Sequence, residues 1–175
     1  MSYNIKHIHS YRKGNVVTIY LPNFCLNQLS QEITHQIIEA LEKINEDKNI
    51  NMVVFRTVQE NFFLPKFPIE NASIISKNII NSDYFINLTD MIQNMRAMTV
   101  TVVEGATNSI GSSFVKASDL SYATESTLFS DGLNVESNQL YNSEKAEIKG
   151  IITRVIPSDK IEITLDYLGS TYEKE

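Results

Sequence analysis

The chain has 175 residues, the length of a single domain with one substantial core. It carries 15 Lys and Arg against 21 Asp and Glu, with no basic block, which argues against non-specific binding to nucleic acid. The single cysteine, Cys25, has no intrachain disulfide partner, and neither a long apolar run nor a signal-peptide pattern after Met1 is present. We therefore expect a globular cytoplasmic protein that does not span a membrane.

A β-hairpin is expected at the start of the chain. The segments Asn4–Tyr11 and Val16–Leu21 read as strands, and Arg12–Asn15 between them contains a Gly-Asn turn signal. His7 and His9 lie two residues apart on one face of the first strand and could form a metal pair, but no third ligand follows them. Surface histidines are therefore favoured over a metal site.

An amphipathic helix is predicted from Gln31 to Glu46, with Ser30 as its N-cap. Its apolar residues recur at helical spacing and predict a face turned to the core: Ile33, Ile37, Ile38, Leu41 and Ile44. The segment Asn51–Thr57 then reads as a strand with a nearly continuous apolar run, which is typical of a strand covered on both faces.

A second helix is predicted from Asp83 to Met98, with Ser82 as its N-cap. Its apolar side is rich in methionine and aromatic residues: Tyr84, Phe85, Leu88, Met91, Ile92 and Met95. A methionine-rich stripe can mark an adaptable binding face, but helical spacing alone explains this one, so ordinary core is favoured.

The most informative stretch follows this helix. It reads as a strand, a turn of small residues, a short helix and a second extended piece, at Thr99–Val103, Glu104–Ser109, Ile110–Ser118 and Leu120–Thr124. Ser109 is the expected N-cap of the short helix. The N-terminus of a helix presents backbone N–H groups and a partial positive charge, so this turn suits an anion or a developing oxyanion.

The remainder of the chain carries weaker signals. Asp131–Ser143 is polar and rich in turn residues, and Lys145–Pro157 is more apolar. Ser158 and Asp159 offer capping for a final helix that ends near Leu168.

The run V-E-G-A-x-N-S-x-G-S-S-F-V-x-A-S-D-L-x-Y-A-x-E-x-x-x-F-S, which begins at Val103, resembles the central block of the crotonase (enoyl-CoA hydratase/isomerase) superfamily. Asn108, Gly111 and Phe114 within it are most similar to the dehydratase-type members that act on carrier-bound acyl chains in polyketide β-branching. Lys145–Pro157 is similar to the family's A-x-x-x-G-L-V-x-x-V-V-P segment.

The resemblance implies an α/β fold, a crotonase-like (ClpP/crotonase) ββα spiral that is shortened at its C-terminal end. Residues 1–175 would form one domain, with the core at 1–144 and a shortened C-terminal strand and helix at 145–175. It also implies acyl-CoA or acyl carrier protein thioesters as partners, assembly into a trimer or hexamer, and no cofactor or metal.

Several positions depart from the family pattern. Phe24 and Cys25 stand in the loop that contacts the coenzyme-A or carrier arm, where a polar or basic pair is usual, which disfavours a free nucleotide-bearing thioester. Asn108 and Gly111 match the substrate-binding block. The two oxyanion-hole amides fall on Lys66, which follows a proline in place of the family glycine, and on Ile110, a further glycine position.

The positions of the family's two glutamates fall on Ser113 and Leu133, and neither side chain can act as a general acid or base at neutral pH. Asp131 is a candidate substitute, as is Glu136 if the loop is re-registered; the alternative is that both are solvated loop carboxylates. Ser113 and its neighbour Ser112 suggest a nucleophile, but His35 is the only histidine beyond the first strand, so no catalytic triad is readable.

Two functions remain open. One is a divergent enzyme that dehydrates or isomerises acyl thioesters in polyketide-type biosynthesis. The other is a catalytically inactive homologue that serves as a binding or assembly subunit. Asp119 is expected to have a structural role at the start of the strand that follows it.

Overall fold

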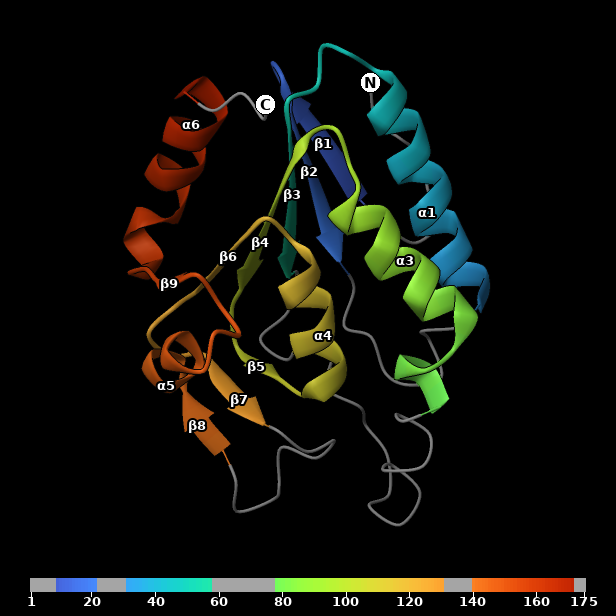
Figure 1. The fold of residues 1–175 in the computed structure, drawn as a ribbon. Helices are drawn as coiled ribbons and strands as arrows, with labels where there is room; N and C mark the ends of the chain where they lie inside the picture. The colour runs from blue at the N-terminus through green and yellow to red at the C-terminus, as the bar shows by residue number, and fades with distance from the viewer. Residues whose placement is uncertain (1–8, 22–30, 58–77, 131–139, 172–175) are drawn as a thin grey trace.

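The computed structural model describes residues 9–21, 31–57, 78–130 and 140–171 (Figure 1). A six-stranded sheet forms its centre, in the order β1-β2-β3-β4-β6-β9. The strand bounds are β1 His9–Lys13, β2 Val16–Leu21, β3 Met52–Thr57, β4 Met98–Val103, β6 Leu120–Ala123 and β9 Arg154–Val155. Only the β1–β2 pair is antiparallel, and the other pairs in this sheet are parallel.

The hairpin prediction is confirmed for the residues described. Lys13 lies opposite Val16, so the turn consists of Gly14 and Asn15 alone, and Gly14 has the positive φ of 62° that such a turn requires. The first strand therefore runs on to Lys13 and does not stop at Tyr11, because a two-residue turn leaves Arg12 and Lys13 free to pair.

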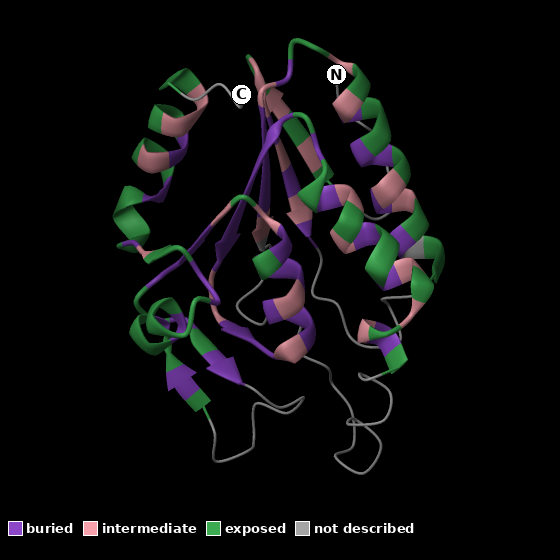
Figure 2. Cartoon of the chain, viewed as in Figure 1, coloured by how far each residue is buried: buried purple, intermediate pink, exposed green. Residues whose placement is uncertain are grey.

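Helices cover both faces of the central sheet. α1 Gln31–Glu46, α3 Asp83–Gln93 and α4 Ser109–Ala117 lie on one side, and α6 Ile161–Thr171 lies on the other, preceded by the 3-10 turn η1 Ser158–Lys160 (Figure 1). The buried positions of these helices lie on the sides turned to the sheet, and the exposed positions lie on the outward sides (Figure 2). The bounds predicted for α1 are confirmed, while the final helix runs on past the predicted end near Leu168.

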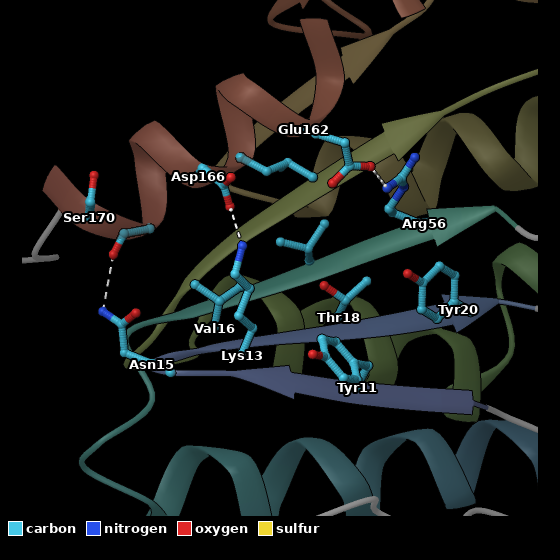
Figure 3. Close-up of a pocket in the computed structure, with 14 residues that line it drawn as sticks. Tyr11, Lys13, Asn15, Val16, Thr18, Tyr20, Arg56, Glu162, Asp166 and Ser170 are labelled. Atoms are coloured by element: carbon cyan, nitrogen blue, oxygen red, sulfur yellow. Dashed lines mark hydrogen bonds and ion pairs between the residues drawn. The ribbon is translucent and has the colours of Figure 1, made fainter. Parts of the chain in front are cut away.

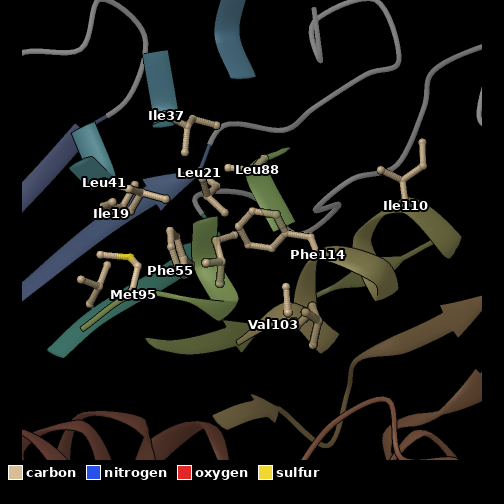
Figure 4. Packing of buried hydrophobic residues seen from close by; sticks show 14 of the residues in the cluster. Ile19, Leu21, Ile37, Leu41, Phe55, Leu88, Met95, Val103, Ile110 and Phe114 are labelled. Carbon is tan, nitrogen blue, oxygen red and sulfur yellow. The ribbon is translucent and has the colours of Figure 1, made fainter. Parts of the chain in front are cut away.

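Two hydrophobic clusters separate the layers. The larger lies under α1, α3 and α4, and it includes Phe55 of β3 and Phe114 of α4, whose rings meet edge to face at 5.2 Å (Figure 4). The smaller lies under α6 and includes Val54 and Leu165. Because Val54 and Phe55 point to opposite clusters and both are fully buried, β3 is covered on both faces, as its apolar run predicted.

A second, three-stranded sheet has the order β5-β7-β8, with bounds β5 Ala106–Thr107, β7 Leu128–Ser130 and β8 Leu140–Asn142. The chain passes from β4 into this sheet at Gly105, whose φ of 93° favours glycine. None of these three strands was predicted, and neither was the short helix α5 Ser143–Ile148, because each has too few residues to show a period.

The predicted end of the second helix is wrong. α3 begins after Ser82, whose side chain accepts from the Phe85 N–H as expected of an N-cap, but it ends at Gln93 and not at Met98. Asn94 closes the helix by donating its backbone N–H to Asp90. Met98 is instead the first residue of β4, because sheet pairing with β3 determines its backbone more strongly than the helical spacing of the preceding residues does.

Candidate functional site

The candidate site lies where β5 leads into α4. Asp119, just beyond the C-terminal end of α4, accepts from the Thr99 N–H at 2.8 Å and from the Thr99 hydroxyl at 3.1 Å. This carboxylate therefore ties the end of the helix to the start of β4, which confirms the structural role predicted for it. At its other end, α4 follows β5 of the three-stranded sheet, with only Asn108 between them.

Asn108 is the N-cap of α4, so the assignment of this role to Ser109 is wrong. The Asn108 Oδ1 atom accepts from the Ile110 N–H at 3.0 Å and from the Gly111 N–H at 3.2 Å. Asn108 has the extended backbone of a cap residue, whereas Ser109 is already helical. A carboxamide also reaches two amides at once, which the shorter serine side chain does less readily.

The Ile110 amide is the second oxyanion-hole donor implied by the family resemblance. In this structure it donates to the protein's own Asn108 side chain. The Ile110 side chain belongs to the larger hydrophobic cluster and is buried, so its β-branched bulk is absorbed by the core. A ligand oxygen would therefore have to displace Asn108 or use a different donor.

Ser113, which the family resemblance predicts at the first glutamate position, donates its hydroxyl to the Ser109 carbonyl at 2.9 Å. This is a local bond within the helix, of the kind that serine side chains commonly make to the residue four positions before them. His35 lies on the exposed side of α1, where Nε2 is 3.3 Å from the Glu39 carboxylate. Within the described part of the chain, no histidine or carboxylate forms a hydrogen bond with the Ser113 hydroxyl that would activate it as a nucleophile.

Four buried polar atoms at the start of α4 have no hydrogen-bond partner among the residues that the structure describes. They are Thr107 Oγ1, Asn108 Nδ2, Ser109 Oγ and Ser112 Oγ, and we call these four residues the α4 start cluster. Buried polar atoms are nearly always paired, so four within six residues indicate that something else satisfies them. All four can donate, and the positive end of the helix adds to the attraction for a ligand oxygen.

Sequence reasoning named Asn108 but did not find this cluster. The sequence does carry a signal for it. Thr107, Asn108 and Ser109 precede the predicted helix and Ser112 follows one turn later, whereas capping requires only one such side chain.

The other predicted site residues lie outside the described residues: Phe24, Cys25, Lys66, Asp131, Leu133 and Glu136. Their roles remain predictions. The described strand nearest to Asp131 in the sequence is β7, which ends at Ser130 and pairs with β5 so that Phe129 lies opposite Thr107.

A separate cavity of about 380 Å³ lies on the opposite face of the central sheet, between α6 and strands β1 to β3 (Figure 3). Lys13 and Asp166 form an ion pair of 3.2 Å across it, and Arg56 pairs with Glu162 (Figure 3). The charges that line the cavity therefore largely neutralise one another, and none of the predicted site residues lies there.

Among the described ranges, no group of three or more His, Cys, Asp and Glu side chains is placed to hold a metal ion. None of the helices in these ranges has both the length and the apolar character needed to cross a membrane.

The sequence matches the family profile described as "Enoyl-CoA hydratase/isomerase" over residues 11–134. No curated protein matches it. Among solved structures, it is similar to a probable enoyl-CoA hydratase from Mycobacterium smegmatis, with 18% identity, a TM-score of 0.73, and coverage of 94% of this chain and 78% of that one.

Two further structures show the same similarity. The enoyl-CoA hydratase from Bacillus anthracis is 16% identical, with a TM-score of 0.72 and coverage of 94% of this chain and 76% of that one. A methylmalonyl-CoA decarboxylase, solved in complex with 2-nitronate-propionyl-CoA, is 17% identical, with a TM-score of 0.73 and coverage of 95% and 75%.

Proposed function

Because this chain belongs to the enoyl-CoA hydratase/isomerase family and has the crotonase-like α/β fold expected of it, we propose that it binds acyl thioesters at the start of α4 without hydrating them. The observation that carries this proposal is that only one end of the Asn108 carboxamide is hydrogen-bonded among the described residues. Its oxygen holds the amides of Ile110 and Gly111, while its nitrogen is buried without a partner among the described residues.

The capacity to bind rests on the donors of the α4 start cluster. A thioester presents one carbonyl oxygen, which is an acceptor, and the four unpaired atoms are all able to donate. One of the structural relatives holds 2-nitronate-propionyl-CoA, an acyl-CoA compound, which supports a ligand of this class.

The absence of hydration rests on the missing proton carriers. Adding water across an enoyl thioester requires a group that accepts a proton from water and a group that returns one to carbon. Ser113 stands at one family glutamate position with its hydroxyl bonded to Ser109, and Leu133 stands at the other. Neither residue can perform this transfer.

A second candidate is dehydration or isomerisation of a carrier-bound acyl chain in polyketide-type biosynthesis, with Asp131 as the acid. It is supported by the sequence block around Asn108 and Gly111 and by the position of Asp131 immediately after β7, the strand that pairs with β5. Reactions of this type need only one well-placed acid or base, so the loss of both family glutamates does not exclude them.

We also propose that the protein assembles as a trimer or hexamer. Large apolar side chains are exposed on α5 and α6, among them Ile148 at 86%, Ile163 at 64% and Tyr167 at 67%. Contacts between subunits would remove these side chains from water. Light scattering tests this directly, and a monodisperse monomer would contradict it.

Mass spectrometry of the protein mixed with crotonyl-CoA and with crotonyl-pantetheine tests the function. We expect native spectra to show bound thioester, and the ligand to be recovered without the mass of an added water. Accumulation of hydrated product would overturn the binding-only proposal. A dehydrated or isomerised product from a 3-hydroxyacyl-pantetheine, lost in the variant Asp131→Asn, would establish the second candidate.

A further inference from the structure

We infer that the Asn108 side chain takes the place of the family's backbone donor. Its Nδ2 donates to the acyl carbonyl oxygen, while its Oδ1 continues to accept from the Ile110 and Gly111 amides. This inference rests on the proposed function, since it names the atom that receives the thioester. It assigns to one residue both the cap of α4 and the recognition of the ligand oxygen.

The orientation of the carboxamide follows from its partners. Two backbone N–H groups point at one end of the side chain, at 3.0 and 3.2 Å, and only an oxygen can accept from them. The flipped amide would place its NH₂ group against two donors, so the assignment of Oδ1 and Nδ2 is settled by chemistry. The NH₂ group therefore points away from the helix amides.

The burial of this NH₂ group needs an explanation. Asn108 is completely buried, and Nδ2 has no partner among the described residues. A buried donor left without an acceptor is destabilising, and aspartate or serine would cap α4 without carrying one. A site for an acceptor that arrives with the ligand accounts for asparagine here.

The neighbouring hydroxyls identify the same kind of ligand atom. Thr107 ends β5 immediately before Asn108 and is fully buried, and Ser112 lies one helical turn after Asn108 at 9% exposure. Both hydroxyls lack partners among the described residues and both can donate. Neutral hydrogen-bond donors of this kind suit an uncharged or partly negative oxygen, such as the carbonyl oxygen of a thioester.

The competing explanation is that Asn108 is a plug, which blocks the Ile110 amide and must swing away before a ligand binds there. The two explanations predict opposite effects of removing the Asn108 side chain on recognition of the carbonyl. If Asn108 is the donor, removing its NH₂ group weakens recognition of the carbonyl. If it is a plug, removing the whole side chain strengthens that recognition.

The experiment compares butyryl-CoA with S-butyl-CoA, a thioether that lacks the carbonyl oxygen, by isothermal titration calorimetry. We expect the wild-type protein to prefer butyryl-CoA about 3- to 10-fold, the value of one hydrogen bond to a neutral acceptor. Asn108→Asp keeps an oxygen for the helix amides but lacks the NH₂ group, so the preference should disappear.

The matched control is Asn142→Asp. Asn142 is the N-cap of α5, and its Oδ1 accepts from the Lys145 N–H at 3.0 Å, so the same substitution is made at the same type of position away from α4. We expect the preference for butyryl-CoA to be unchanged in this variant. Circular dichroism of each variant confirms that it is folded.

Asn108→Gly is the second variant, because glycine is tolerated at an N-cap at a cost of a few tenths of a kcal/mol. A lost preference supports the donor, and a gained preference supports the plug and overturns the inference. Retention of the preference in Asn108→Asp also overturns it. Equal wild-type affinity for both compounds overturns this inference but leaves thioester binding intact, whereas binding of neither compound overturns both.

Discussion

Substitution of Gly169 by alanine tests how closely α6 packs on the central sheet. An alanine Cβ at this position would lie 2.7 Å from Val16 Cγ2, which is closer than two carbon atoms can approach without displacement. The same turn of the helix is held by the Asn15 side chain, which donates to the Gly169 carbonyl at 3.1 Å. The helix therefore cannot move away from β2 without stretching this bond.

Two effects of opposite sign decide the result. Alanine is better than glycine in a helix by about 1 kcal/mol. Overpacking against the stiff, β-branched Val16 costs about 1–3 kcal/mol. We therefore expect Gly169→Ala to lower the free energy of unfolding by about 0–2 kcal/mol. In a Val16→Ala background the clash is gone, and the same substitution should instead raise the free energy by about 1 kcal/mol.

Urea denaturation of the wild type, both single variants and the double variant gives the coupling energy between the two positions. We expect a coupling of about 1–3 kcal/mol, equal to the overpacking term. Ser170→Ala, an exposed position on the same helix, serves as the control and should change stability by less than about 0.5 kcal/mol. A Gly169→Ala variant that is more stable than the wild type, with no coupling to Val16, would refute the close packing of α6.

Three further substitutions test contacts that hold the fold together. Asp119→Ala should lower the free energy of unfolding by about 1–3 kcal/mol in urea denaturation, because it leaves the buried Thr99 N–H without its acceptor; a neutral result would show that water replaces the carboxylate. Phe114→Ala should cost about 3–5 kcal/mol, measured in the same way, since its ring fills the core beneath α4; a loss below 1 kcal/mol would mean that the core closes around the gap. The hydrogen bond from the Asn49 N–H lowers the pKa of Asp47, so its contribution to stability is present above the unfolded pKa and is lost as pH falls through the folded one. Asp47→Asn should therefore flatten the pH dependence of unfolding below about pH 4, and an unchanged acid limb would contradict this.

Much of the fold was predictable from local patterns. The apolar stripe of α1 has the helical period over its full length, and the continuous apolar run at Met52–Thr57 gave the strand buried on both faces. The end of α3 was not predictable in this way, because Met95 and Met98 continue the helical spacing after Asn94 has closed the helix. Pairing of Met98 with Met52 across the sheet, a contact between residues far apart in the sequence, decides where β4 begins.

The helix that carries the candidate site was predictable, but the contacts at its start were not. The turn before α4 was predicted from the sequence, and Asn108 and Ile110 were named there as site residues. Their roles, and the assignment of Ser113 to a glutamate position, remain predictions. The bond from the Ile110 amide to Asn108 was not predicted, since serine and asparagine are both common N-cap residues and the sequence alone does not show which of the two adjacent residues has the cap conformation. The unpaired Nδ2 likewise depends on which atoms surround it, and local sequence does not carry that information.

An NMR titration that follows individual amide protons at the start of α4 as butyryl-CoA is added tests most directly whether Asn108 Nδ2 donates to the acyl oxygen. We expect the side-chain NH₂ protons of Asn108 to shift downfield as they bond to the acyl oxygen, while the backbone amides of Ile110 and Gly111 stay near their initial positions because Oδ1 still accepts from them. A downfield shift of the Ile110 amide, with the Asn108 side chain unaffected, would contradict this assignment. It would show that the backbone amide, and not the Asn108 side chain, donates to the acyl oxygen.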